Sequence, residues 1–361
     1  MYKNNDAKQA KEIQGDIDTQ IAAAQSELYP TSVQRELREV FQTFSERFDA
    51  ERGGLNKAPK FPMPSQWLFL LRYHFLTENT DALNHVLLTL DKMAEGGIYD
   101  QVGGGFARYS VDAEWFAPHF EKMLYDNGQL LSLYAEAFSL TKSDLYRQVL
   151  TDTVTFVQRE LTSSKGGFYS ALEADSEGEE GKYYVWKYDE LQQVLGDTTD
   201  MLTDYFSATP KGNWENGNNI LHLSLSESEF ARKYELSLPD FGEIVTKAKQ
   251  DLLERRSQRE RPGLDDKIIA GWNGLMLRGL GEAYTALGDE SILKLAQQNA
   301  QFLQSNLIQL VGEVASISHT YAKDERNIEG FLDDYAFVAD GLIALYQVTF
   351  EEQWLYLADH L

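Results

Sequence analysis

The chain has 361 residues, of which 43% are hydrophobic and 12% aromatic, so it can bury a large core. Its 33 basic and 57 acidic residues leave a formal net charge of −24, which argues against nucleic acid and membranes as partners because both attract a basic surface. The chain contains no cysteine, which excludes disulfides, thiolate nucleophiles and zinc–thiolate sites within it.

The chain begins with a polar segment that does not read as a signal peptide. No later apolar run approaches the roughly 18 residues of a membrane span. We therefore expect a polar N-terminal extension over residues 1–30 and a cytoplasmic location.

Two kinds of helical segment alternate along the rest of the chain. One kind carries a single apolar stripe, as a helix with one buried face does, and covers residues 33–48, 83–93, 145–161 and 292–307. The other kind is apolar on nearly all sides, as an interior helix is, and covers residues 120–138, 268–284 and 331–346. This alternation predicts a layer of outer helices around a layer of inner ones.

The interior segments also repeat. An Asn-Gly pair followed by apolar positions and a Glu-Ala-aromatic ending occurs at Asn127 and again at Asn273, with looser copies at Asp334 and Pro64. A period of about 60–70 residues indicates one stacked helical hairpin, with a divergent fifth unit in the long gap that includes residues 183–196.

The connections between the two kinds of helix are asymmetric. Turns from inner to outer helices are short, whereas those from outer to inner helices are long and cover residues 51–63, 96–117, 162–186 and 309–328. All long loops should therefore gather at one end, where loops on a rigid scaffold usually carry function. We predict an all-α fold, a double-layer (α/α)6-type barrel over residues 31–361 that stops before its last inner helix.

The loop before the segment 120–138 carries the first candidate residues. Its triple glycine, residues 103–105, allows close backbone approach to another loop or to a flat ligand, but no phosphate-loop motif surrounds it. Pro118 suits the first turn of a helix, which would put His119 at the helix N-terminus with a lowered pKa, as a base or electrophile. His119 could equally cap or pack against the loop. Asp126 lies about two turns further on the same face.

Carboxylates and aromatic rings in the other long loops point toward sugar chemistry. Asp175 and Glu177 belong to the acidic stretch 173–180, which is either a solvated turn or a source of the paired acid and base that glycosidases use. We predict His119, Asp126, Asp175 and Glu177 as catalytic, with Asp126 or Asp334 as the second carboxylate of a hydrolase. The predicted substrate-binding residues are Tyr99, Asp100, Arg108, Tyr109, Trp115, Glu121, Trp214, Trp272, Asn273, Asp334 and Tyr335.

Trp272 could also be a core residue, since it begins an interior helix. The acidic stretch does not have the spacing of an EF-hand. It could still hold a divalent cation, but we predict neither a metal nor another cofactor.

Five stretches together resemble one known family. They begin at Lys60, Gly96, Gly166, Asp265 and Phe331 and read KFPMPS, GGIYDQVGGGFARYSVDAEWFAPHFEKMLYDNGQLL, GGFYSALEADSEGEEGKYYVW, DDKIIAGWNGLM and FLDDYAF. They are similar to the thioredoxin-domain-containing protein family that includes the mammalian spermatogenesis-associated protein, over its barrel region only. The resemblance implies a barrel similar to the six-hairpin glycosidases and N-acylglucosamine 2-epimerases. It also implies a thioredoxin-like domain as a partner in full-length relatives, and we expect these 361 residues to hold the barrel region alone.

Two functions remain open from the sequence. The first is a carbohydrate-active enzyme, either a sugar epimerase or isomerase or a glycoside hydrolase, with a small sugar or glycan as its ligand. The second is a non-catalytic module that binds a glycan or peptide for the thioredoxin-like domain.

Overall fold

The computed structural model describes residues 31–312, 314–321 and 328–361, so the predicted extension over residues 1–30 lies outside the described residues. The chain divides into two compact units, residues 1–48 and residues 49–361. Helix α2 (Thr31–Ser45), expected as an outer helix of the barrel, falls in the first unit. There the ring of Phe48 packs edge-on against Phe44 and Phe41, with ring centroids 5.2 and 6.3 Å apart.

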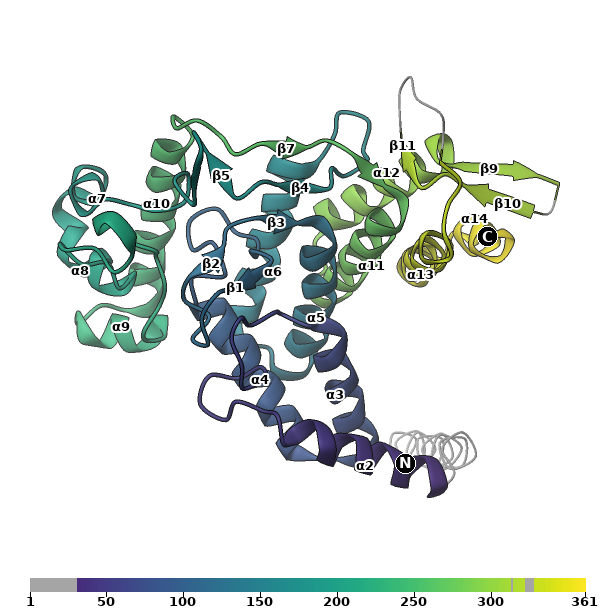
Figure 1. The fold of residues 1–361 in the computed structure, drawn as a ribbon, viewed down its shortest axis with the longest axis horizontal. Coiled ribbons are helices and arrows are strands. Elements are labelled where there is room, and N and C mark those ends of the chain that lie inside the picture. Colours follow the sequence, from purple (N-terminus) through teal and green to yellow (C-terminus); the bar gives the residue numbers. More distant parts are fainter. Residues whose placement is uncertain (1–30, 313, 322–327) are drawn as a thin grey trace, which may run out of the picture. The chain divides into compact units, whose positions relative to one another are not determined.

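The second unit is built on inner helices that lie side by side in chain order (Figure 1). They are α3 (Pro64–Thr77), α5 (Leu124–Thr141), α11 (Ala270–Leu287) and α13 (Leu332–Thr349). The glycine of the repeated Asn-Gly pair explains how closely they pack. A Cβ on Gly128 would lie 2.9 Å from the Met276 backbone of α11, and one on Gly274 would lie 2.4 Å from the Phe337 carbonyl oxygen of α13. Only glycine permits this approach of two helix backbones.

Each inner helix is followed by an outer helix that packs on it. The outer helices are α4 (Thr80–Glu95), α6 (Asp144–Phe156) with its π-helical continuation η1 (Val157–Leu161), α12 (Glu290–Asn306) and α14 (Glu352–His360). The turns share one design. The residue after the inner helix takes a left-handed conformation and donates its N–H to the carbonyl four residues earlier. These residues are Glu78, Lys142, Gly288 and Phe350.

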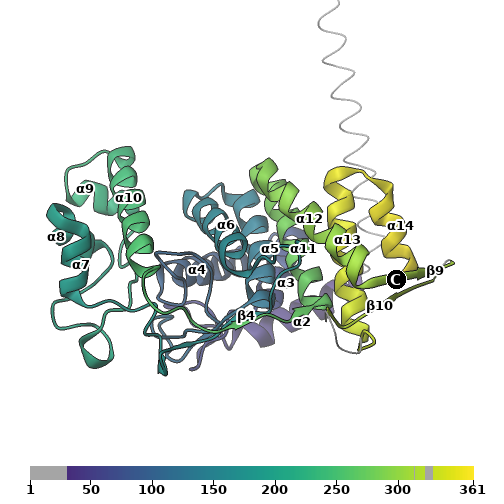
Figure 2. The same ribbon diagram turned by 90° about the horizontal axis from the view of Figure 1, so that it is seen from above.

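The long connections meet at one end of the inner helices, as predicted (Figure 2). Short antiparallel strands join them: β3 (Lys122–Met123), β4 (Ala171–Leu172) and β7 (Leu264–Asp265) form one sheet, and β8 (Ile268–Ile269) pairs with β11 (Thr320–Tyr321). The remaining pairs are β1 (Tyr109–Ser110) with β2 (Pro118–His119), β5 (Asp175–Ser176) with β6 (Glu179–Glu180), and β9 (Ile308–Val311) with β10 (Val314–Ile317). We call this end the mouth.

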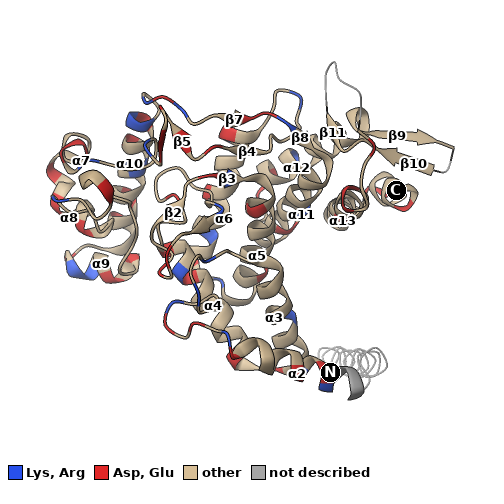
Figure 3. Cartoon of the chain, viewed as in Figure 1, with Lys and Arg blue, Asp and Glu red and all other residues tan. Residues whose placement is uncertain are grey.

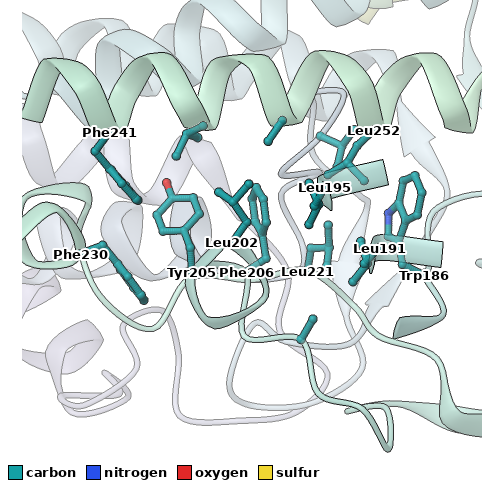
Figure 4. Close-up of a cluster of buried hydrophobic side chains, with 14 of the residues drawn as sticks. Trp186, Leu191, Leu195, Leu202, Tyr205, Phe206, Leu221, Phe230, Phe241 and Leu252 are labelled. Atoms are coloured by element: carbon teal, nitrogen blue, oxygen red, sulfur yellow. The ribbon is translucent and has the colours of Figure 1, made fainter. Parts of the chain in front are cut away.

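The prediction of a divergent inner unit around residues 183–196 is wrong. Helices α5 and α11 pack directly on each other, which leaves no place for an inner helix between them. The intervening residues instead form an insertion with its own hydrophobic core (Figure 4). It comprises α7 (Tyr188–Leu195), η2 (Gly196–Thr198), α8 (Thr199–Tyr205), η3 (Glu215–Gly217), α9 (Glu227–Lys233) and α10 (Leu238–Arg256). Leu191 and Leu195 of the short helix α7 belong to this core, and so do Phe241 and Leu252 of α10.

Acidic and basic residues are interspersed along the mouth loops and the insertion (Figure 3). The acidic excess of the sequence is therefore not gathered on one element. Within the described part of the chain, no helix has both the length and the apolar character that crossing a bilayer requires.

Candidate active site

Equivalent positions of three neighbouring inner helices lie at the mouth. The third residue of α5 is Asp126, that of α11 is Trp272 and that of α13 is Asp334. These three predicted site residues therefore lie at the same end of the fold, the mouth, because each is in the first turn of an inner helix.

The residue after each of these positions holds the preceding loop. Asn127 accepts the Phe106 N–H at 2.8 Å and donates to the Phe106 carbonyl at 3.1 Å. Asn273 makes the same pair of bonds to Phe168, at 2.8 and 3.0 Å. In each Asn-Gly pair, the asparagine thus hydrogen-bonds to the preceding loop, and the glycine allows the next inner helix to pack closely. The polar atoms of Asn273, predicted to bind substrate, are occupied by this structural task.

Tyr335 has the corresponding task at α13. Its hydroxyl accepts the N–H of Ile317 at 3.3 Å, which ties the loop before α13 to the helix. This contact gives the predicted ligand-binding residue Tyr335 a structural role.

Asp126 is a buried acid at the mouth. It is 8% exposed, and its Oδ2 atom has no hydrogen-bond partner among the described residues. Burial raises the pKa of Asp126 to about 7, since the lowering by Arg108 is smaller than the cost of desolvation and Glu121 adds to the rise. A carboxyl group with these properties is partly protonated at neutral pH and has one oxygen that no described residue bonds.

Charged and aromatic side chains surround this carboxyl. Arg108 donates to Glu121 at 3.1 Å and also interacts with the hydroxyl of Tyr125, the residue before Asp126. The Tyr125 ring meets Trp272 of α11 edge to face, with centroids 4.8 Å apart. Arg108, Glu121 and Trp272 were predicted, whereas Tyr125 was missed. Its place directly beside Asp126 at the start of an inner helix could have indicated it.

His119 joins the same cluster from β2. Its Nδ1 lies 2.7 Å from Glu180 Oε1, its Nε2 lies 3.8 Å from Glu121, and its ring stacks on Tyr109 at 5.0 Å between centroids. The prediction that His119 begins a helix is wrong, because residues 118–119 pair with β1 and α5 begins at Leu124. The helix dipole therefore does not act on its ring as supposed, and Asp126 is not two turns along the same helix.

Two other predicted ligand-binding residues lie in the protein interior. The Tyr99 hydroxyl donates to Asp152 at 3.1 Å. The Trp115 side chain is fully buried, and its indole donates to the Arg52 carbonyl at 2.9 Å. These two side chains support the loops and have no surface left for a ligand.

Asp100 is the centre of a buried ion cluster. It bonds to Lys122 at 2.8 Å and to both terminal nitrogens of Arg256 at 2.9 Å. Although burial opposes ionisation, the two cations hold the pKa of Asp100 far below its usual range. The triple glycine lies on this cluster, since a Cβ on Gly103 would collide with Arg256. Asp100 and the triple glycine are therefore structural, and the close approach predicted for the glycines is to protein groups.

Asp175 and Glu177 lie on the exposed hairpin β5–β6, whose Glu180 contacts His119. Glu177 pairs with Lys182 at 3.1 Å. The hairpin borders a groove of ≈ 850 Å³ that is also lined by Trp214, whose ring meets Phe120 at 5.5 Å. In the described part of the chain, this stretch included, no three acidic or histidine side chains converge as metal ligands would.

The structure also shows a histidine that the predicted site did not include. His319 Nδ1 lies 2.7 Å from Oδ2 of Asp334 at the start of α13. Asp334 was predicted to bind substrate, but it is 1% exposed and contacts His319 instead. The signal in the sequence was a histidine in a mouth loop, and its partner fifteen residues later could not be identified from spacing.

No protein-family profile matches the chain. A family 76 glycoside hydrolase from a bovine Bacteroides thetaiotaomicron strain aligns over 90% of this chain and 54% of its own, with a TM-score of 0.50 and 12% identity, which supports the α/α-barrel fold and no more.

The chain is 37% identical over 354 residues to human spermatogenesis-associated protein 20, which covers 87% of this chain and 44% of the human protein. It is 35% identical to the Caenorhabditis elegans uncharacterized protein B0495.5, over 85% of this chain and 47% of that protein. The chain thus spans less than half the length of these curated relatives. Over most of its own length, the chain is a homologue of spermatogenesis-associated protein 20 from human, mouse and rat.

Proposed function

We propose that the mouth binds a sugar or glycan and carries out acid–base chemistry on it, of the sugar epimerase or isomerase type or of the glycoside hydrolase type. The observation that carries this proposal is the Asp126 carboxyl, which is buried, has no partner for one oxygen among the described residues and lies in the first turn of an inner helix. Because its pKa is raised to about 7, it can donate a proton to a ring, carbonyl or leaving-group oxygen near neutral pH.

The neighbours of Asp126 suit a sugar. The Trp272 and Tyr125 rings meet edge to face and offer apolar surface to the C–H faces of a pyranose. Arg108 and Glu121 supply a donor and an acceptor for hydroxyl groups. This combination of a flat apolar surface with a few polar groups is typical of small-molecule sites.

His119 supplies the second proton-transfer group. Glu180 bonds to its Nδ1, which leaves Nε2 on the side of Glu121. With Asp126 as the acid and His119 as the base, the mouth would contain both groups that proton transfer to and from a sugar requires.

The test is a sugar panel followed by proton NMR in D2O. The full chain is incubated with D-glucose, D-mannose, N-acetylglucosamine, cellobiose and an α-mannan oligosaccharide. Epimerisation or isomerisation gives new anomeric signals with deuterium at the reacting carbon, and hydrolysis gives new reducing ends. We expect one of these conversions, and we expect Asp126→Asn to slow it by about 10²-fold or more.

Asp144→Asn is the matched control, since the Asp144 side chain lies on an outer helix and is 93% exposed. It should leave turnover unchanged. Equal rates for wild type and Asp126→Asn would contradict the assigned role. Binding without turnover would contradict catalysis and favour the alternative of a glycan-binding module, and neither binding nor turnover would contradict the proposal as a whole.

A further inference from the structure

We infer that His319 is a third proton-transfer residue of the mouth, beside Asp126 and His119, and that Asp334 positions it; this inference rests on the proposed sugar chemistry. Two histidines in the described part of the chain, His119 and His319, bond to a carboxylate. The functional cluster around Asp126 uses the first of them. His319 lies in a different loop, and its carboxylate partner Asp334 lies on a different inner helix.

Asp334 is held in one orientation by backbone groups. Its Oδ1 accepts the N–H of Gly271 at 2.9 Å, and its Oδ2 accepts the N–H of Phe331 at 2.9 Å. The His319 Nδ1 atom lies 2.7 Å from the same Oδ2. An ionised carboxylate is only an acceptor, so the proton of a neutral His319 ring belongs on Nδ1.

This arrangement leaves Nε2 of His319 as the basic nitrogen. The side chain is 25% exposed, and no described residue bonds to Nε2. The Phe331 ring meets the imidazole edge to face at 5.0 Å and limits its rotation. The geometry is that of a base whose second nitrogen is fixed by a carboxylate, as in acid–base triads in general.

Backbone hydrogen bonds also join His319 to the helix that carries Trp272, whose ring and that of Tyr125 form the aromatic surface of the mouth. Its carbonyl accepts the N–H of Ala270 at 2.9 Å, and Thr320 pairs with Ile269. His319 is thus joined to the first turn of α11, two residues before Trp272. Trp272 in turn contacts Tyr125 of α5, next to Asp126. A sugar lying on Trp272 would have the Asp126 cluster toward α5 and the His319 pair toward α13.

The proposed step is a reversible proton transfer. Nε2 of His319 takes a proton from a substrate hydroxyl, and the ring becomes an imidazolium beside the Asp334 carboxylate. The proton returns to the product later in the cycle, so the enzyme is unchanged and no further reactant is needed.

The experiment combines histidine NMR with two variants of the full chain. A long-range ¹H–¹⁵N correlation spectrum, assigned with His319→Gln, should show the Nδ1–H tautomer for His319. The sugar to be added is one that changes the fluorescence of Trp272, with Trp272→Phe as the reference. This sugar should shift the Nε2 resonance of His319. His319→Gln should reduce turnover about 10²-fold or more while leaving the backbone bonds of Asp334 intact. Asp334→Asn should invert the tautomer and alter the pH profile of turnover.

Two results would overturn the inference while leaving the proposed function intact. One is an Nε2–H tautomer in the wild-type chain. The other is a sugar that is converted and changes Trp272 fluorescence, while His319→Gln keeps full turnover and Nε2 does not shift. If no sugar affects Trp272 or depends on Asp126, the proposed function fails, and the proton-transfer role of His319 fails with it.

Discussion

Replacing Asp126 by asparagine should stabilise the fold at alkaline pH while it removes activity. The pKa of Asp126 rises from 3.8 to about 7 because the carboxyl is buried. Each tenfold change in an equilibrium is worth about 1.4 kcal/mol, so the ionised form costs about 4 kcal/mol of folding free energy above pH 7. Between these pKa values the folded chain binds more protons than the unfolded chain, so this contribution to stability falls as pH rises from about 4 to about 7.

The neutral amide of Asp126→Asn does not ionise and avoids this cost. We expect the variant to gain about 4 kcal/mol over wild type at pH 8 and less than about 1 kcal/mol at pH 4. Urea unfolding followed by tryptophan fluorescence at both pH values measures the difference, with Asp144→Asn as the exposed control. The reasoning is refuted if the stability difference between Asp126→Asn and wild type is the same at pH 4 and pH 8.

Three further substitutions test the structural assignments. Asn273→Ala leaves the buried N–H and carbonyl of Phe168 unpaired and should lower the free energy of unfolding by about 2–4 kcal/mol. A lower urea midpoint would show this loss, and an unchanged midpoint would contradict the role of Asn273 as a loop anchor. Gly128→Ala puts a Cβ 2.9 Å from the Met276 backbone and should cost about 1–3 kcal/mol, seen as a lower thermal midpoint by circular dichroism. Asp100→Ala leaves two buried cations unpaired and should cost about 3–5 kcal/mol at pH 7. Since the pKa of Asp100 is lowered, its contribution should be present above pH 4 and lost below, so the unfolding curves of wild type and variant should converge on acidification.

The helical layers were predictable because apolar periodicity reports how many sides of a helix are buried. The repeated Asn-Gly pair was also visible, but its meaning was not. Asn273 looked like a polar group available to a sugar, and only the bond to Phe168, 105 residues earlier, shows that it holds a loop. The insertion was misread because one short amphipathic helix, α7, has the same local pattern as a helix of the barrel.

The site was predictable as a region and less so as a set of residues. The sequence by itself determined that the long loops share one end and that acids, histidines and aromatic rings lie there, because short turns force the long connections together. The tertiary structure decided which of these acids forms an ion pair and which does not. Asp100 meets Arg256, 156 residues away, and becomes a paired ion, whereas Asp126 is buried with one oxygen that no described residue bonds. Desolvation and pairing depend on groups that are distant in sequence, so two aspartates that look alike in the chain acquire opposite pKa shifts in the fold.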